Sequence, residues 1–189
     1  MEEPAVIRPV RVEDTEDVAR LFLESARHHV DLEPDLYRVP ELDQVIQEHL
    51  QWLGRDDRAI LVAEVGGRVV GSLSVRVVEP PGGAGMIRPR RSADIGITVT
   101  SELRGRGIGT RLMQEGEAWA RDHGAEMLTL NGHVANTGAL RLYERMGFRN
   151  VGFFMIKDLL PHPSGEGRGG EELPHPPGEG RGGEELPPP

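Results

Sequence analysis

The sequence predicts an α/β (α+β) fold in which helices cover a mixed sheet. Two observations support this prediction. Several short segments are rich in Val, Ile and Leu and are bounded by Gly, Pro or Asn, which is typical of β-strands. Other segments repeat apolar residues at every third or fourth position, which is typical of helices with one buried face. Along the chain these segments follow the order β-α-α-β-β-β-α-β-α-β-β, so we expect six to seven strands and about four helices.

The first half of the chain is predicted to contribute one strand, two helices and a β-hairpin. Glu13 and Asp14 place negative charge where a helix begins, which suits the helix dipole. The second helix has the most regular apolar spacing in the chain, from Leu42 to Leu53. Gly66-Gly67 is a two-residue hairpin signal. The expected bounds are 5–9 for the strand, 13–29 and 42–53 for the helices, and 59–65 and 68–79 for the hairpin strands.

The second half is predicted to alternate strands and helices after a Gly- and Pro-rich loop over 80–91. Gly124 and Gly147 suit the ends of two helices, because glycine adopts the left-handed conformation that terminates a helix. Asn136 or Thr137 is expected to cap the second of these helices. The expected bounds are 94–100, 127–131, 148–151 and 153–157 for the strands, and 108–124 and 136–147 for the helices.

The composition separates a globular part from a C-terminal tail. Residues 161–173 recur with one change at 174–186, and 16 of the 29 residues from Pro161 onward are Gly or Pro. Such a segment buries too little apolar surface to fold, so we expect a globular domain over 1–160 and a disordered tail over 161–189. A duplicated DNA segment read in frame and an interaction tail are the two interpretations of the repeat.

The composition also excludes several kinds of protein. The chain has no cysteine, so disulfides and a thiol nucleophile are excluded. It has no apolar run of about 18 residues and no basic-then-apolar leader, which predicts a cytoplasmic protein without a membrane partner. The net charge of −9 argues against general binding of nucleic acid. The seven histidines show no ligand spacing, so no metal is expected.

The stretch Arg104–Thr110 is predicted to bind phosphate. Its three glycines let the backbone turn tightly and approach a ligand, and the amides at the start of the next helix lack intrahelical partners. Arginine at two positions adds donors that match phosphate geometry. A nucleotide-triphosphate loop fits poorly because no lysine follows Gly109, and the Gly-x-Gly-x-Gly spacing does not match a dinucleotide-binding turn.

Two motifs resemble the GNAT superfamily of acetyl-CoA-dependent acetyltransferases. Residues Arg104-Gly105-Arg106-Gly107-Ile108-Gly109 match the family signature Arg/Gln-x-x-Gly-x-Gly/Ala. The segment Asn136–Phe148 resembles the family pattern Asn-x-x-Ala-x-x-Leu-Tyr-x-x-x-Gly-Phe. The start of the chain, Ile7-Arg8-Pro9 with Glu13-Asp14, is also similar. The resemblance covers 5–160 and implies a GNAT-like, mostly antiparallel twisted sheet.

The resemblance also implies a donor and roles for individual residues. Acetyl-CoA would be the cosubstrate, and Val99 would bond its pantetheine arm. Asn136 would contact the same arm, although a helix cap alone also explains this residue. Tyr143 would act as the general acid that protonates the departing thiolate, with a packed aromatic side chain as the alternative. The residues that would wrap the pyrophosphate are Arg104, Gly105, Arg106, Gly107, Ile108, Gly109 and Thr110.

The activity expected from this resemblance is N-acetylation of a primary amine, which attacks the thioester directly in a ternary complex. A backbone N–H on the strand ending at Val99 would stabilise the oxyanion. The alternatives are a catalytically silent acyl-CoA-binding GNAT domain that acts as a sensor or assembly module and, more distantly, a nucleotide-binding protein. The loop over 80–91 would border the acceptor pocket, form an interface such as that of a homodimer, or be solvated surface.

The acceptor and the general base stay open at the sequence level. An amine must lose a proton before it attacks, so Glu, Asp, His or water is expected as the base. Asp94 lies near the position of the family's glutamate, but one residue out of register, which reverses the face in a strand. The other candidates are His29, Glu33, Tyr37 and His133, whereas His28 and His49 are expected to be structural.

Overall fold

The computed structural model describes residues 4–80, 82, 85–86, 88–152, 155–157 and 159. The chain divides into two units, Met1–Arg149 and Asn150–Pro189. Every described helix and strand belongs to the first unit. The tail predicted over 161–189 lies outside the described residues.

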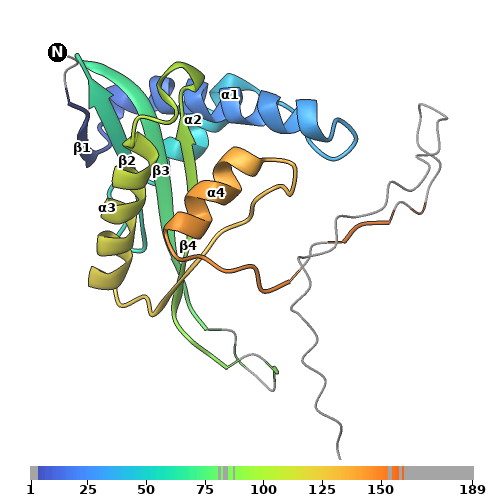
Figure 1. Ribbon diagram of the computed structural model, residues 1–189. Helices are drawn as coiled ribbons and strands as arrows, with labels where there is room; N and C mark the ends of the chain where they lie inside the picture. Colours follow the sequence, from blue (N-terminus) through green and yellow to red (C-terminus); the bar gives the residue numbers. More distant parts are fainter. Residues whose placement is uncertain are drawn as a thin grey trace, which may run out of the picture. The chain divides into compact units, whose positions relative to one another are not determined.

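The first unit contains a five-stranded sheet whose strands lie in chain order (Figure 1). Neighbouring strands from the first to the fourth are antiparallel, and the fifth runs parallel to the fourth. This confirms the predicted mixed, mostly antiparallel sheet. The strands are β1 (Val6–Pro9), β2 (Arg58–Val65), β3 (Arg68–Val78), β4 (Ser92–Val99) and β5 (Met127–Thr129).

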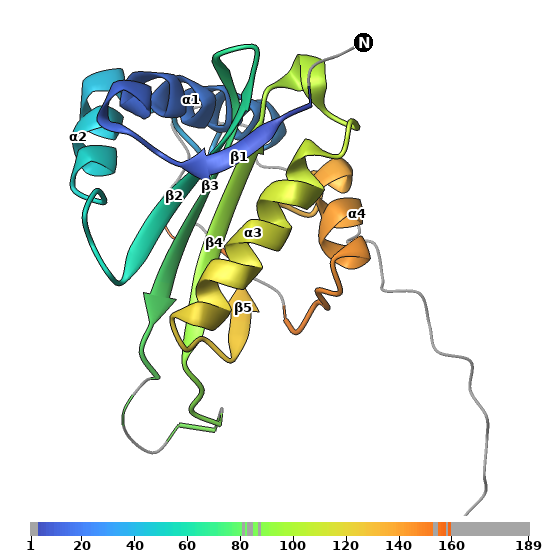
Figure 2. The same cartoon turned by 90° about the vertical axis from the view of Figure 1, so that its left-hand side faces the viewer.

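Helices cover both faces of this sheet. Figure 2 shows α1 and α2 on one face and α3 and α4 on the other. The four helices match the number predicted from the sequence. They are α1 (Thr15–Leu32), α2 (Leu42–Leu50), α3 (Ile108–Asp122) and α4 (Thr137–Arg145), with short 3-10 turns η1 (Val12–Asp14) and η2 (Ser101–Leu103).

The alternation of side chains along the strands divides the core between the two faces. On the face covered by α3, Leu73 of β3 is fully buried together with Leu112 and Met113 of the helix. Gly116 lets α3 lie close to the sheet, because a Cβ there would stand 2.7 Å from a methyl carbon of Leu73. On the opposite face, Val18 of α1 packs on β2.

A partly buried ion cluster joins the first strand to the start of the first helix and to β2. Arg8 donates to both oxygens of the Asp14 carboxylate at 2.6 and 2.9 Å, and to Glu64 at 2.6 and 2.9 Å. The hydrogen bond from Arg8 lowers the pKa of Asp14, and the N–H of Arg11 at 2.7 Å adds to this effect. Asp14 stands at the start of α1 as its N-cap, as expected from the sequence, and also forms this ion pair.

The strand count differs from the sequence prediction. Six to seven strands are expected, whereas the described residues form five. Residues 148–151 form no strand, because Phe148 donates its N–H to the carbonyl of Tyr143 at 3.0 Å and so closes α4. The last predicted strand, 153–157, includes residues outside the described part, and its residues 155–157 are not in a strand.

Helix α2 and strand β5 are among the elements that are shorter than predicted. Helix α2 ends at Leu50 rather than Leu53, since residues 51–54 form turns that finish at Gly54 with a φ of +70°. Strand β5 covers three residues instead of 127–131. Within the described part of the chain, no helix has the length and apolar character needed to cross a membrane.

Candidate functional site

The junction between β4 and α3 is a strand–turn–helix with two left-handed glycines. Gly105 has a φ of +77° and Gly107, the N-cap of α3, has a φ of +82°. A Cβ on either glycine would meet nothing within 4 Å, so the backbone conformation rather than crowding favours glycine. The first helical bond runs from the N–H of Arg111 to the carbonyl of Gly107 at 3.1 Å. The amides of the first turn, Ile108–Thr110, therefore have no intrahelical acceptor.

The C-terminal part of β4 has a neighbouring strand on one side only. Strand β5 pairs with Ser92–Asp94 and then ends, so Ile95–Val99 is paired with β3 alone. The N–H of Thr100 donates to the carbonyl of Val70 on β3 at 2.9 Å. Because backbone groups alternate in direction along a strand, the N–H and carbonyl of Val99 point away from β3. They face the side of β4 that β5 no longer covers, which is called the open side of β4 below.

The side chain of Arg104 folds back onto β4 and α1. Its Nε donates to the carbonyl of Val99 at 3.0 Å, and its guanidinium lies 3.5 Å from the Glu24 carboxylate on α1. Glu24 also accepts the N–H of Ser101 at 2.9 Å. These contacts fix the turn to α1. The sequence does not point to Glu24, because 77 to 80 residues separate it from its partners.

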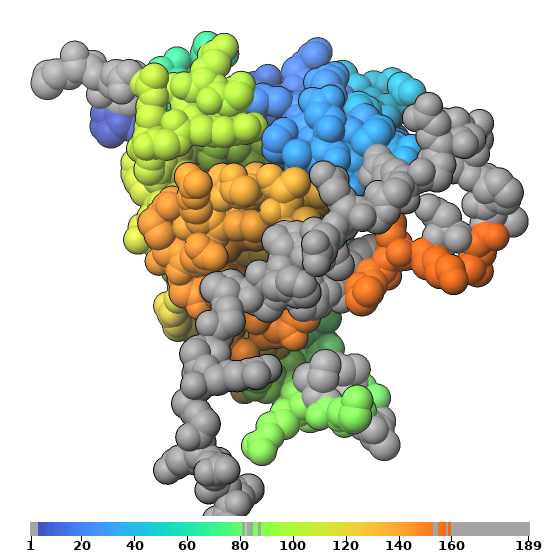
Figure 3. Space-filling view, turned by 45° about the vertical axis from the view of Figure 1, so that its right-hand side comes forward, coloured from blue at the N-terminus to red at the C-terminus, as the bar shows by residue number. Residues whose placement is uncertain are grey.

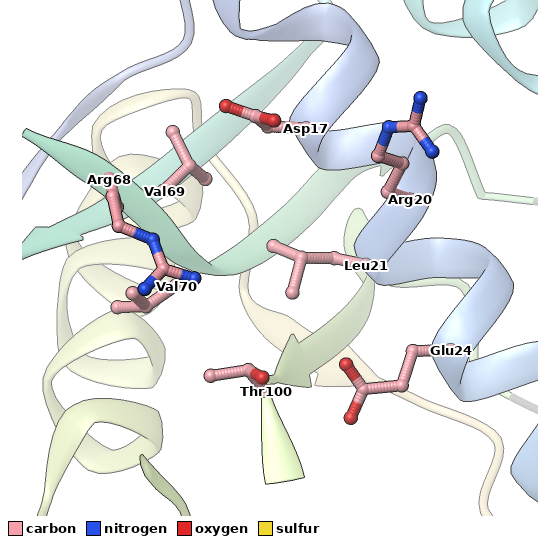
Figure 4. Close-up of a pocket in the computed structure, with 8 residues that line it drawn as sticks. All are labelled: Asp17, Arg20, Leu21, Glu24, Arg68, Val69, Val70 and Thr100. Atoms are coloured by element: carbon pink, nitrogen blue, oxygen red, sulfur yellow. The ribbon is translucent and has the colours of Figure 1, made fainter. Parts of the chain in front are cut away.

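A small polar hollow lies beside this turn, between α1 and β3. Figure 4 shows the side chains of α1 on one side of it and those of β3 on the other, with Thr100 and Glu24 at the end next to the turn. Its volume is about 160 Å³. None of the predicted cofactor-binding residues lines it. The lining residues are Asp17, Arg20, Leu21, Glu24, Arg68, Val69, Val70 and Thr100.

Helix α4 presents the second predicted group of site residues. The Oδ1 of Asn136 accepts the N–H of Ala139 at 3.2 Å, which confirms Asn136 as the N-cap. The Tyr143 ring packs 6.0 Å from Phe148 and close to Gly132, where a Cβ would lie 3.3 Å from the ring. Burial raises the pKa of Tyr143, so its hydroxyl stays protonated at neutral pH.

The glycine turn and α4 are in contact. A Cβ on Gly109 would lie 3.2 Å from a methyl carbon of Leu142, the residue before Tyr143. Figure 3 shows the turn (yellow-green), α4 (orange) and part of α1 (blue) beside one another on one face of the first unit. The structure therefore places the glycine turn and the Asn136–Phe148 segment, the two GNAT-like motifs, next to the open side of β4.

Four of the five base candidates form one cluster. The His133 Nε2 lies 3.9 Å from the Glu33 carboxylate, and its ring centroid lies 5.9 Å from that of Tyr37. The Tyr37 ring in turn lies 5.1 Å from the His29 ring. The Nδ1 of His29 is engaged with the carbonyl of Ser25 at 2.8 Å. Residues from the end of α1, the segment after it and the loop after β5 thus meet at one place.

Asp94, the fifth candidate, has other partners. Its neighbours Ala93 and Ile95 are buried in the core under α3, so Asp94 points to the opposite face of the sheet. There its carboxylate accepts the Thr129 hydroxyl at 3.3 Å and lies 3.8 Å from Arg76. Asp94 therefore lies on the face of the sheet that α1 and α2 cover, and its role as a base stays a prediction.

His49 is half-buried against α1. Its ring meets Phe22 edge-on at 6.1 Å, and its Nδ1 is buried without a hydrogen-bond partner among the described residues. Burial lowers its pKa, because the imidazolium would lose its hydration. His49 is thus a packed, neutral side chain, as expected from the sequence.

A sequence model of the acetyltransferase (GNAT) family matches residues 26–148, which include both motifs. The chain belongs to this family. An uncharacterized N-acetyltransferase of Methanocaldococcus jannaschii is 31% identical over 144 residues, covering 75% of this chain and 59% of that protein. N-acetyltransferase 8 of Mus musculus is 37% identical over 92 residues, covering 48% of this chain and 38% of that protein. The chain therefore spans less than two thirds of the length of these relatives.

Solved structures share the GNAT fold with this chain. A mutant of the BH1408 protein from Bacillus halodurans has a TM-score of 0.75 at 23% identity, covering 82% of this chain and 99% of that one. An aminoglycoside N-acetyltransferase in complex with CoA has a TM-score of 0.62 at 18% identity, covering 82% of this chain and 93% of that one. At these identities the likeness concerns the fold.

Proposed function

We propose that this GNAT protein is an N-acetyltransferase that moves an acetyl group from acetyl-CoA to a primary amine. The observation that carries the proposal is the meeting of three features: the left-handed glycine turn, the unpaired side of β4 and Tyr143 on α4. Amides, a strand edge and a protonated phenol are the groups that binding a CoA thioester and releasing its thiol require.

The residues present fit the donor. The first-turn amides of α3, with the backbone of Gly105 and Gly107, would hold the pyrophosphate, since a Cβ-free turn permits close approach. The outward N–H of Val99 would bond the pantetheine arm in the manner of a neighbouring strand. Asn136 is engaged as a cap, so its contact with the arm would use groups other than the oxygen that holds Ala139.

Acetyl-CoA, when bound, supplies a thioester whose carbonyl carbon forms the new C–N bond while the C–S bond breaks. A backbone N–H on the open side of β4 would stabilise the oxyanion. Tyr143 would give its proton to the departing thiolate, because its hydroxyl is protonated at neutral pH. The proton lost by the amine passes to a carboxylate, an imidazole or water.

The test is CoA thiol release with acetyl-CoA and a panel of primary amines, comparing the wild type with Tyr143→Phe. We expect turnover on at least one amine and a loss of kcat by about 100-fold or more in the variant, as for removal of a general acid. CoA affinity, measured by calorimetry, should change little because the ring is kept. Tight binding of CoA with no turnover on any amine would instead identify a silent acyl-CoA-binding module.

A further inference from the structure

An apolar hollow of about 300 Å³ lies between α1 and the segment that leads to α2. His29 also lines the hollow, and its Nδ1 is engaged with the carbonyl of Ser25 at 2.8 Å. Arg38 is exposed and belongs to the rim. A space of this size is at the lower end of those that bind small molecules. The lining residues are Phe22, Ser25, Ala26, His29, Tyr37, Arg38 and Pro40.

Exposed apolar side chains gather in the segments that form and adjoin this hollow. Phe22 on its wall is 46% exposed, which is unusual for a large aromatic residue in the middle of a helix. Leu36 and Val39 flank the lining residues in sequence and are 41% and 39% exposed. Val134, next to His133, is 60% exposed. An apolar ligand group would remove such surface from water.

A carboxylate stands near one side of the hollow. Tyr37 lines the hollow and also contacts His133, whose Nε2 faces Glu33 at 3.9 Å. The Nδ1 of His133 accepts the N–H of Ala135 at 3.2 Å, so in the neutral ring the proton is on Nε2. His133 therefore presents an N–H toward Glu33 and, through its contact with Tyr37, joins this carboxylate to the lining of the hollow.

The same loop connects this cluster to Tyr143. Gly132 lies against the Tyr143 ring, whereas the next residue, His133, lies against Tyr37. Successive Cα atoms are about 3.8 Å apart. Gly132 and His133 are neighbours in one loop. The first contacts Tyr143, the proposed general acid, and the second faces the Glu33 carboxylate.

From this geometry we infer that the hollow is the acceptor site and that the acceptor is a primary amine with an aromatic or bulky apolar body. The body occupies the space between Phe22, Ala26 and Tyr37, and the ammonium pairs with Glu33. This inference rests on the proposed function, since it names the substrate class of the same enzyme.

The test measures binding without requiring turnover. Calorimetry on the full chain, with and without CoA, compares 2-phenylethylamine with ethylamine, which lacks the ring, and with 2-phenylethanol, which lacks the charge. We expect 2-phenylethylamine to bind more tightly than either by about tenfold or more, because each analogue leaves one half of the site unfilled. Equal affinity for 2-phenylethylamine and ethylamine would overturn the inference.

Two variants locate the binding site. Ala26→Trp should fill the hollow and weaken 2-phenylethylamine by about tenfold or more, whereas Arg27→Trp, at the next and exposed position, should leave it unchanged. Glu33→Gln should weaken 2-phenylethylamine but not 2-phenylethanol. Thermal melts of each variant check that it is folded. Unchanged binding of 2-phenylethylamine in a folded Ala26→Trp variant would also refute the inference.

The outcomes separate the inference from the proposed function. If thiol release proceeds on ethylamine as fast as on 2-phenylethylamine, the acetyltransferase stands and the acceptor class is wrong. If 2-phenylethylamine binds as expected while no amine is acetylated, the ligand site stands and the proposed activity is wrong.

Discussion

Asp14 is the residue whose single replacement should weaken the fold most clearly. It is 6% exposed and bound to Arg8, so Asp14→Asn would leave a partly buried guanidinium with Glu64 as its main remaining partner. We expect a loss of about 3 kcal/mol in the free energy of unfolding, as for other broken buried ion pairs. Glu16→Gln, which breaks the exposed pair with Arg20, is the matched control and should cost less than about 0.5 kcal/mol.

Asp14 should also make the free energy of unfolding depend on pH in the acid range. Because the folded pKa of Asp14 is lowered, its contribution is present above the unfolded pKa of about 3.9 and is lost as pH falls through the folded pKa. Urea unfolding of wild type and Asp14→Asn at pH 6 and pH 3 measures this. A difference between the two proteins that does not shrink at pH 3 contradicts the assignment.

His49 should produce a second pH dependence, in a different range. Its pKa is lowered by burial, so the unfolded chain takes up a proton near pH 6.5 before the folded chain does. The free energy of unfolding should therefore fall as pH drops below about 6.5, and His49→Leu should fall less steeply between pH 7.5 and 5.5. Identical slopes in both proteins would show that the buried imidazole is not responsible.

At the scale of elements, α3 is held close to the sheet by a glycine. Gly116→Ala would bring a methyl group to 2.7 Å from Leu73, whose side chain is fully buried. Overpacking of this kind costs about 1–3 kcal/mol, which outweighs the gain of about 1 kcal/mol in helix propensity. We therefore expect a lower urea midpoint for Gly116→Ala.

Gly138→Ala is the control for that substitution. It lies in α4, where a Cβ would come no closer than 3.9 Å to another side chain, so helix propensity alone acts. This variant should be equal to or more stable than the wild type by up to about 1 kcal/mol. If Gly116→Ala were stabilised as much as Gly138→Ala, the close contact with Leu73 would not limit the packing of α3.

The helices and the hairpin follow from local patterns, which is why the sequence predicts them well. The apolar spacing of α2 and α3 and the cap at Asn136 depend on neighbours within a few residues. The extent of β5 depends on where β4, which is distant in the sequence, offers a partner, so it leaves no local signal. The absence of a strand after Phe148 follows from the hydrogen bond of its N–H to the carbonyl of Tyr143, which ends α4.

At the scale of the whole molecule, the residues proposed to bind acetyl-CoA are easier to predict from the sequence than the residues proposed to bind the acceptor. The glycine turn and the α4 segment are contiguous motifs, so their residues can be named from the sequence. The cluster proposed for the acceptor combines His29 from α1, Glu33 and Tyr37 from the segment after it, and His133 from beyond β5. Each residue is unremarkable by itself, and only the fold brings them together.

The proposed function makes one prediction about a complex. In a crystal structure of the chain with CoA, the pyrophosphate oxygens should lie about 3 Å from the amides of residues 105–110, and the sulfur should lie beside the hydroxyl of Tyr143. The pantetheine arm should run along the open side of β4 near Val99. CoA bound in the hollow between α1 and β3, or with its sulfur turned away from α4, would contradict the account.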